Sequence, residues 1–311
     1  GVDQILHGIT FNGTDTELVV ACEDATGYVV DLEKGNIRKE LKGHAFRVTC
    51  LAYHPDGIWM ALGSYDSTVT VWHGETGLMR SKLRSFGGAV LCVRFLPFGP
   101  FLCVGAVDKS TKVFHVLTGE MQFSLSAHSL AVRKMCISSE GIIATASDDK
   151  EVRLWDCRMP WHEAMGTQLA VCRGHKGPIT SCQLTREGKG LLSAAEDKTM
   201  IVWDVIHGAI MRILVGHTKP VMECFMLEDE PEPGKEQIIE RRSMITGDIR
   251  YIVSASEDST VRVWDLTTGY DVCYVRLQNP LTCMAKSQDN SLIAAGDEKG
   301  GVHIFELKQA M

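Results

Sequence analysis

A unit of about 40 to 45 residues recurs along the whole chain, and this period constrains the fold more than any other feature. The clearest copies end in a Trp-Asp pair, at Trp155, Trp203 and Trp264. The period was measured at the Trp position or at the residue that takes its place, which gives Val30, Trp72, Phe114, Trp155, Trp203, Trp264 and Phe305. The steps are 42, 42, 41, 48, 61 and 41 residues. The chain therefore contains seven copies of one supersecondary unit, and the two longer steps indicate insertions.

Each unit has the pattern of four short strands joined by tight turns. In the second unit the apolar runs lie at 48–53, 59–63, 68–72 and 78–83, and turn residues separate them at 54–57, 65–67 and 75–77. Short apolar runs bounded by Gly, Pro, Asp and Ser are typical of strands, and these turn residues suit tight hairpins. The sequence therefore predicts an all-β fold, a seven-bladed β-propeller of four-stranded antiparallel blades.

The repeat resembles the WD-repeat (WD40) β-propeller family over essentially the whole chain. In that family a His before the first strand, a Ser or Thr of the second strand, an Asp of the following turn and the Trp of the third strand form a buried hydrogen-bond network. Three units carry all four residue types, namely His128, Thr145, Asp149 and Trp155; His175, Ser193, Asp197 and Trp203; and His217, Ser254, Asp258 and Trp264.

The resemblance implies a structural role for these twelve residues. An indole N–H, a hydroxyl, an imidazole and a carboxylate can satisfy one another's hydrogen bonds where water is excluded. We therefore interpret the three histidines as structural rather than as catalytic residues or metal ligands.

The other four units depart from this pattern. The second keeps His44, Asp66 and Trp72 but has Leu62 where a hydroxyl is expected. The third has Val104 and lacks the His, and the first and seventh keep almost none of the set. We expect these blades to be held mainly by apolar packing.

Length and composition agree with one domain that spans residues 1–311. Hydrophobic residues make up 45% of the 311 residues, enough for a substantial core. The predicted blades lie at approximately 1–42, 43–85, 86–127, 128–173, 174–215, 216–278 and 279–311. Insertions are predicted at 158–168 and 228–250, and the resemblance implies that both lie on the same face of the ring. The second begins with a charged, Pro-containing run that is interpreted as a solvated loop, and a segment that orders on a partner is the alternative.

The two chain ends leave the last blade open. Only five residues precede Leu6, which aligns with the start of the first strand in the other units, and six follow Phe305. Either the seventh blade has three strands, or this chain is a piece of a longer protein, which the absence of Met at position 1 favours.

Cysteine usage indicates a reducing compartment. The 11 cysteines include no Cys-x-x-Cys pair and no cluster at zinc-ligand spacing, so we predict no metal and no cofactor. Six fall in the first strands of successive blades, at Cys50, Cys92, Cys136, Cys182, Cys224 and Cys283. The sequence contains no run of about 18 apolar residues that would indicate a membrane span. The expected location is cytoplasmic, with the nucleus and the cilium left open.

One face of the ring is the predicted docking surface. The resemblance implies that partners contact the start of each inner strand and the residue before the turn Asp. The predicted partner-binding residues are Glu23, Arg47, Tyr65, Leu91, Val107, Arg133, Asp148, Glu196, Met222, Glu257 and Glu298. Five of the seven turn positions are acidic, which favours a protein or peptide segment that carries Lys or Arg. The alternative is that the acidic residues only keep this face soluble.

Other classes of function are disfavoured. The net charge of −7, together with scattered basic residues, argues against nucleic acid as a partner. The chain has no Gly-x-Ser-x-Gly elbow, phosphate-binding loop or His-Glu-x-x-His site. We therefore predict a non-catalytic scaffold or adaptor within a multiprotein complex. A propeller enzyme or hydrolase with its site at the central channel is the alternative.

Overall fold

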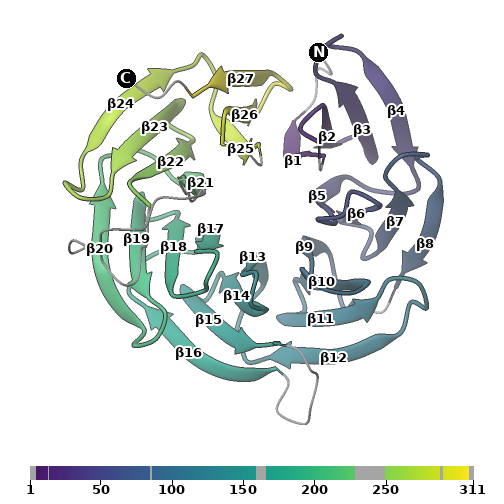
Figure 1. The fold of residues 1–311 in the computed structure, drawn as a ribbon, viewed down its shortest axis with the longest axis horizontal. Coiled ribbons are helices and arrows are strands. Elements are labelled where there is room, and N and C mark those ends of the chain that lie inside the picture. Colours follow the sequence, from purple (N-terminus) through teal and green to yellow (C-terminus); the bar gives the residue numbers. More distant parts are fainter. Residues whose placement is uncertain are drawn as a thin grey trace, which may run out of the picture.

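Strands account for all the regular secondary structure in the computed structural model, which describes residues 5–12, 14–84, 86–158, 166–227, 249–287 and 290–307. Seven sheets surround a central opening like the blades of a propeller (Figure 1). Six sheets have four antiparallel strands, and the seventh has three within the described residues. The predicted all-β, seven-bladed propeller is confirmed, and its last blade is the incomplete one.

The strands follow one another outward in each of the first four blades. Blade one contains β1 (Leu6–Phe11), β2 (Glu17–Cys22), β3 (Thr26–Asp31) and β4 (Ile37–Lys42). Blade two contains β5 (Val48–Tyr53), β6 (Trp59–Ser64), β7 (Val69–His73) and β8 (Met79–Leu83). Blade three contains β9 (Val90–Phe95), β10 (Phe101–Ala106), β11 (Ser110–His115) and β12 (Met121–Ser126). Blade four contains β13 (Val132–Ile137), β14 (Ile142–Ser147), β15 (Glu151–Asp156) and β16 (Thr167–Arg173).

The last three blades repeat this order. Blade five contains β17 (Ile179–Leu184), β18 (Gly190–Ala195), β19 (Thr199–Asp204) and β20 (Ala209–Val215). Blade six contains β21 (Val221–Leu227), β22 (Tyr251–Ser256), β23 (Thr260–Asp265) and β24 (Asp271–Arg276). Blade seven contains β25 (Leu281–Lys286), β26 (Leu292–Asp297) and β27 (Val302–Glu306). Most of the predicted insertions, at 159–165 and 228–248, lies outside the described residues.

The turn between the second and third strands of a blade depends on its aspartate. The residue after the Asp has a positive φ in six blades, at Ala25, Ser67, Lys109, Lys150, Lys198 and Ser259. Residues other than glycine rarely adopt this conformation. The Asp side chain stabilises it by accepting the N–H two residues on, as between Asp197 and Thr199 at 3.0 Å. Blade seven instead places Gly300 in this region, with a φ of 83°.

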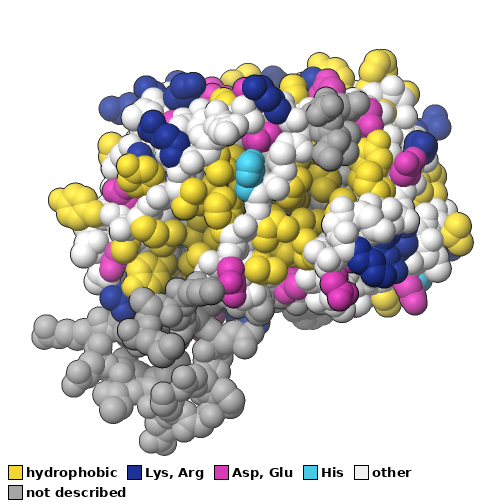
Figure 2. All heavy atoms as spheres, turned by 90° about the horizontal axis from the view of Figure 1, so that it is seen from above, with side chains coloured by type: hydrophobic (Ala, Val, Ile, Leu, Met, Phe, Trp, Pro, Cys, Tyr) yellow, Lys and Arg dark blue, Asp and Glu magenta, His cyan; other side chains and the backbone are white. Residues whose placement is uncertain are grey.

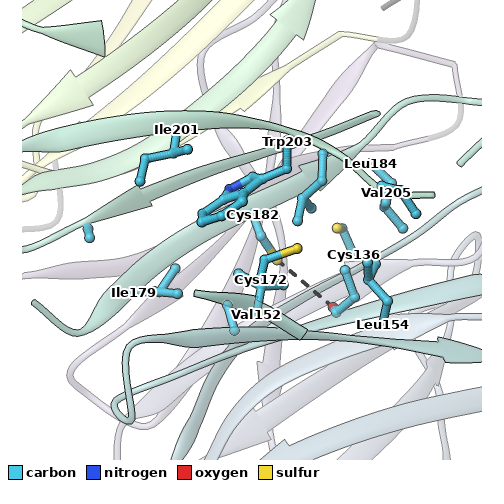
Figure 3. Packing of buried hydrophobic residues seen from close by; sticks show 14 residues of the cluster. Cys136, Val152, Leu154, Cys172, Ile179, Cys182, Leu184, Ile201, Trp203 and Val205 are labelled. Atoms are coloured by element: carbon cyan, nitrogen blue, oxygen red, sulfur yellow. Dashed lines mark hydrogen bonds between the residues drawn. The ribbon is translucent and has the colours of Figure 1, made fainter. Parts of the chain in front are cut away.

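Apolar clusters fill the interfaces between neighbouring blades in the described part of the chain. Figure 3 shows the cluster between blades four and five, where Trp203 lies against Cys172 and Cys182. Another cluster joins blade seven to blade one. There the Thr282 hydroxyl donates to the carbonyl oxygen of Leu6 at 2.7 Å. The ring is therefore closed on its inner side.

The inner-strand cysteines pack as small apolar residues. Cys50, Cys92 and Cys283 each pair with a glycine on the neighbouring strand. At Gly63 an added Cβ would lie 2.6 Å from the Cys50 sulfur, so the larger side chain requires its small partner. Burial raises the pKa of the Cys50 thiol to about 11, which disfavours the reactive thiolate.

Candidate functional site

Three blades contain a continuous hydrogen-bond network that links the Trp to the turn Asp. In blade five, Trp203 Nε1 donates to Ser193 Oγ at 2.7 Å, Ser193 Oγ lies 2.8 Å from His175 Nε2, and His175 Nδ1 lies 3.0 Å from Asp197. The corresponding distances in blade four are 2.8, 2.8 and 2.9 Å, through Trp155, Thr145, His128 and Asp149. In blade six they are 2.8, 2.7 and 2.9 Å, through Trp264, Ser254, His217 and Asp258.

One assignment of protons satisfies every group in such a network. The indole N–H donates to the hydroxyl, the hydroxyl donates to Nε2 of a neutral imidazole, and Nδ1–H donates to an ionised carboxylate. Burial lowers the pKa of His217, which favours the neutral ring. Burial acts to raise the pKa of Asp258, but hydrogen bonds from Thr260, Thr218 and His217 outweigh it and bring the pKa to about 2. These buried groups satisfy one another's hydrogen bonds within each blade.

Blade two requires a correction to the expectation from sequence. His44 Nε2 lies 2.8 Å from the hydroxyl of Thr70, which accepts the indole N–H of Trp72 at 2.9 Å. His44 Nδ1 lies 3.1 Å from Asp66. Thr70 is on β7 directly opposite Leu62 on β6, so the hydroxyl comes from the neighbouring strand. The expectation that blade two lacks the hydroxyl of the network is therefore wrong, and its apolar packing is supplemented by a complete set of these bonds.

The predicted rim positions share one backbone geometry. In six blades the residue before the turn Asp, or its counterpart, donates its N–H to the carbonyl oxygen of a residue just before the inner strand. This bond is 3.0 Å at Tyr65, Val107 and Asp148, 2.9 Å at Glu196, and 3.1 Å at Glu257 and Glu298. Because the bond recurs in six blades, these side chains take equivalent places around one face of the ring.

Two arginines neutralise part of the acidic rim. Arg133 pairs with Asp148 of its own blade and with Glu196 of the next, at 3.0 Å from the latter. Arg47 lies 3.5 Å from Glu23 and stacks 4.5 Å above the ring of Tyr65. Glu23 is also bonded to His7; this bond is the largest cause of the lowered pKa of Glu23. Three of the five acidic side chains are therefore already paired.

Glu257 and Glu298 make no ion pair with any other described residue. Glu257 borders a polar pocket of about 290 Å³, which Lys219, Arg276 and Gln278 also line. This volume is at the lower limit for small-molecule sites. Among the described residues, the rim carboxylates without an ion pair are thus on blades six and seven, with Lys219 and Arg276 lining the same pocket as Glu257.

The other side of the rim is apolar. Tyr65 and Val107 are exposed on blades two and three, and Leu91 on blade three is half-buried. The predicted rim residue Met222 is also half-buried, but it lies on blade six, beside the acidic positions. The structure adds Phe46 and Leu130, both exposed and each two residues before an inner strand. Sequence reasoning missed them, although the same position holds Gly88, Gly177, Lys219 and Asn279 in other blades. The difference between an aromatic or aliphatic residue in two blades and a small or polar residue in the others is the sequence signal that could have identified Phe46 and Leu130.

A charged cluster on the innermost strands was also missed. Lys134 on β13 pairs with Glu223 on β21, and the Ser181 hydroxyl on β17 donates to Glu223 at 2.6 Å. Ser181 is completely buried. A serine beside a carboxylate resembles part of a hydrolytic site, but this hydroxyl cannot reach a substrate. The cluster ties together the inner strands of blades four, five and six.

Among the described residues, no group of three or more His, Cys, Asp and Glu side chains could hold a metal ion. The part of the chain that the structure describes also has no helix with the length and hydrophobicity needed to span a lipid bilayer.

Comparison with known proteins identifies the repeat. The model of the family described as WD domain, G-beta repeat matches residues 35–73, 80–115, 119–156, 166–204 and 245–265, more than half of the chain. The chain belongs to the WD40 family. The resemblance seen in the sequence is confirmed, and the matches cover WD40 repeats in the second to sixth blades.

Several curated proteins contain a similar WD40 region. Autophagy-related protein 16 of Arabidopsis thaliana is 24% identical over 170 residues, 55% of this chain and 29% of that protein. Apoptotic protease-activating factor 1 of Danio rerio is 24% identical over 253 residues, 81% of this chain and 18% of that protein. COMPASS component SWD3 of Saccharomyces cerevisiae is 26% identical over 147 residues, 47% of this chain and 39% of that protein. The aligned region is less than two fifths of each relative.

Proposed function

We propose that this WD40 propeller is a non-catalytic scaffold that binds protein partners on its rim. The partner segment carries a Lys or Arg that Glu257 and Glu298 bind, and an apolar group that contacts Phe46, Tyr65, Val107 or Leu130. The observation that carries this proposal is the division of the rim into an unpaired acidic sector and an exposed apolar sector. Charge would orient the partner, and apolar contact would supply most of the affinity.

The names of two relatives support action through other proteins. One is named as a component of COMPASS, and another as an activating factor for a protease. The engagement of the four network histidines with Asp and hydroxyl groups supports a non-catalytic role. The burial of Ser181 weighs against a hydrolase site at the channel.

A peptide array tests the proposed rim site. Each Lys- or Arg-containing peptide is paired with a copy in which Gln replaces the basic residue, and the binding of the intact chain is measured. The double variant Glu257→Gln/Glu298→Gln should bind the basic peptides about threefold to tenfold more weakly, as expected for two partly exposed ion pairs.

The matched control is Glu23→Gln/Glu196→Gln, which changes the net charge equally on the same face. Its carboxylates are already paired with Arg47 and Arg133, so we expect a smaller loss of binding. Equal losses in the two double variants would show that only net charge matters. Binding that neither variant changes would refute the acidic site.

A further inference from the structure

Blade six carries the polar pocket of about 290 Å³ on the rim side of the ring. Its first wall is residues 218–219, in the loop before β21, and its second is the turn at 257–259. Its third wall is residues 276–278, at the end of β24 and just beyond it. Figure 2 looks onto blades six, seven and one with the rim along its upper edge, and Lys and Arg side chains gather at the upper left, on the blade-six side. The pocket thus combines basic side chains with the acidic rim position Glu257.

Hydrogen bonds fix the three walls relative to one another. The N–H of Thr218 donates to Asp258 at 3.0 Å, and the N–H of Leu277 donates to the carbonyl oxygen of Ser259 at 2.8 Å. The Asp258 side chain is only 4% exposed, and it also accepts the hydroxyl of Thr260 at 2.5 Å. The negative charge of Asp258 is therefore stabilised inside the blade, and a ligand would meet walls that are already in place.

Two basic side chains of the pocket have no carboxylate partner. Lys219 and Arg276 are exposed, and neither forms an ion pair with another residue that the structure describes. Blade four differs, because Arg173 at the position of Arg276 has its Nε 2.6 Å from Glu151 on the opposite strand. In blade six the residue opposite Arg276 is the uncharged Thr260. Arg276 is thereby left able to bind an added anion.

The combination of two basic residues is particular to blade six among blades two to six. The residue two before the inner strand, which is Lys219 in blade six, is Phe46, Gly88, Leu130 and Gly177 in blades two to five. The residue at the Arg276 position is Arg84, Ser126, Arg173 and Val215 in the same blades. The hydroxyls of Thr218 and Ser259 and the amide of Gln278 add hydrogen-bond donors to the two charges. Such a set of donors suits the oxygens of a carboxylate or a phosphate.

We propose that this pocket binds an anionic side chain of the partner segment, a carboxylate or a phosphate ester, beside the Lys or Arg that Glu257 and Glu298 bind. Because Glu257 lines the same pocket, an isolated anion would meet one like charge together with two opposite charges. A segment that carries both signs pairs with Glu257, Lys219 and Arg276 at once. This inference rests on the proposed function and makes it more specific, since the partner segment then has neighbouring opposite charges rather than a basic residue alone.

The surrounding charges favour a peptide over a nucleic acid. A nucleic acid presents a row of phosphates and is bound by an extended basic surface. Here the carboxylates of Glu257 and Glu298 occupy equivalent places on the same rim and would repel the neighbouring phosphates. A phosphorylated Ser or Thr carries a charge of about −1.5 to −2 at pH 7, so it should bind more tightly than Asp or Glu.

A peptide array with a moving anion tests the proposal. Each peptide has one fixed Lys and carries Asp or phosphoserine at one of the other positions in turn, and the reference peptides carry Ser there. Binding of the intact chain should increase when the anion lies close to the Lys, more for phosphoserine than for Asp. The double variant Lys219→Gln/Arg276→Gln should remove this increase, which we expect to be about threefold to tenfold. It should not weaken binding of the reference peptides.

The matched control is Lys176→Gln/Lys198→Gln, which removes the same charge from the same face. Both lysines are exposed, belong to blade five and lie outside the pocket, so this variant should keep most of the increase. Equal losses in the two double variants would show that only net charge matters and would overturn the proposal. An array in which neither Asp nor phosphoserine increases binding at any position would also overturn it.

The Glu257→Gln/Glu298→Gln variant separates this inference from the proposed function. It should weaken binding of all the Lys peptides and keep the increase caused by the anion. If Lys219→Gln/Arg276→Gln removes the increase while the Glu variant changes nothing, the pocket binds an anion and the basic-residue site is wrong. If only the Glu variant has an effect, the anion pocket is wrong and the proposed function stands. Single-stranded DNA that binds through Lys219 and Arg276, with no binding of the charged peptides, would contradict both.

Discussion

Replacing Thr70 by valine tests whether blade two depends on its buried hydroxyl. Thr70 is completely buried, and valine has nearly the same shape. The change removes the acceptor for Trp72 Nε1 and the hydroxyl next to His44 Nε2, which would keep only a 3.2 Å contact with the carbonyl oxygen of Leu62. An unsatisfied buried polar group costs about 1–3 kcal/mol. We therefore expect the free energy of unfolding to fall by about 2–4 kcal/mol.

Thr111 on β11 provides a matched control in the next blade. It is only 1% exposed, and its hydroxyl oxygen has no hydrogen-bond partner among the residues that the structure describes. Thr111→Val replaces an unsatisfied hydroxyl by a methyl group, so stability should be unchanged or should rise by about 1 kcal/mol. Thr70→Ser keeps the hydroxyl and should lose about 1 kcal/mol for the missing methyl group.

Urea unfolding at pH 7.5, followed by far-ultraviolet circular dichroism, gives the free energy of unfolding for all four proteins. The reasoning would be refuted if Thr70→Val and Thr111→Val had the same stability within about 0.5 kcal/mol, the usual scatter of surface substitutions. It would also fail if Thr70→Ser lost as much stability as Thr70→Val.

Three further predictions concern pH, thiols and packing. Burial lowers the pKa of four histidines from the ordinary value of 6.5, namely His44, His128, His175 and His217. The unfolded chain therefore binds more protons than the folded chain below that pH, and the urea concentration at the unfolding midpoint should fall as the pH is lowered from 7 to 5. A midpoint that does not change over this pH range would contradict the prediction. Asp66, Asp258 and Asp297, with pKa values of about 2, should add a further loss between about pH 4 and 2. Cys273 is exposed and the other ten cysteines are buried. Ellman's reagent should therefore label one thiol per native chain and eleven after unfolding. Rapid labelling of several thiols in the native chain would contradict the tight packing of the inner strands. Gly63→Ala should lower the free energy of unfolding by about 1–3 kcal/mol, because the new Cβ would lie 2.6 Å from both Cys50 and Val90. Gly8→Ala is the control: the nearest atoms to its new Cβ are at 3.7 Å, so the same unfolding assay should show little change.

The repeat allowed the architecture to be predicted because strand and turn signals occur at nearly constant spacing. Insertions at 158–168 and 228–250 changed the spacing without hiding the Trp-Asp pairs. The hydroxyl of blade two could not be found from a fixed offset, because Thr70 occupies the strand opposite the expected position. Any residue whose side chain reaches the same point in space can fill the role, and a linear pattern does not record this.

Charge pairing on the rim was also beyond the sequence. The shared backbone bond gives Asp148, Glu196, Glu257 and Glu298 equivalent places on one face, but whether their carboxylates are unpaired depends on long side chains from neighbouring blades. Arg133 reaches Glu196, 63 positions away. Residue types alone do not fix such rotamers, so the sequence predicted the sign of the rim charge but not where it remains unpaired.

The contact between Thr282 and Leu6 joins residues 276 positions apart in the chain. During synthesis, blade one therefore emerges long before the strand that it will lie against. Until blade seven is made, the apolar side of blade one that belongs to the shared cluster has no permanent neighbour. The growing chain consequently passes through a partly built ring whose first and last blades both expose apolar surface. A chaperone would be most useful during this interval.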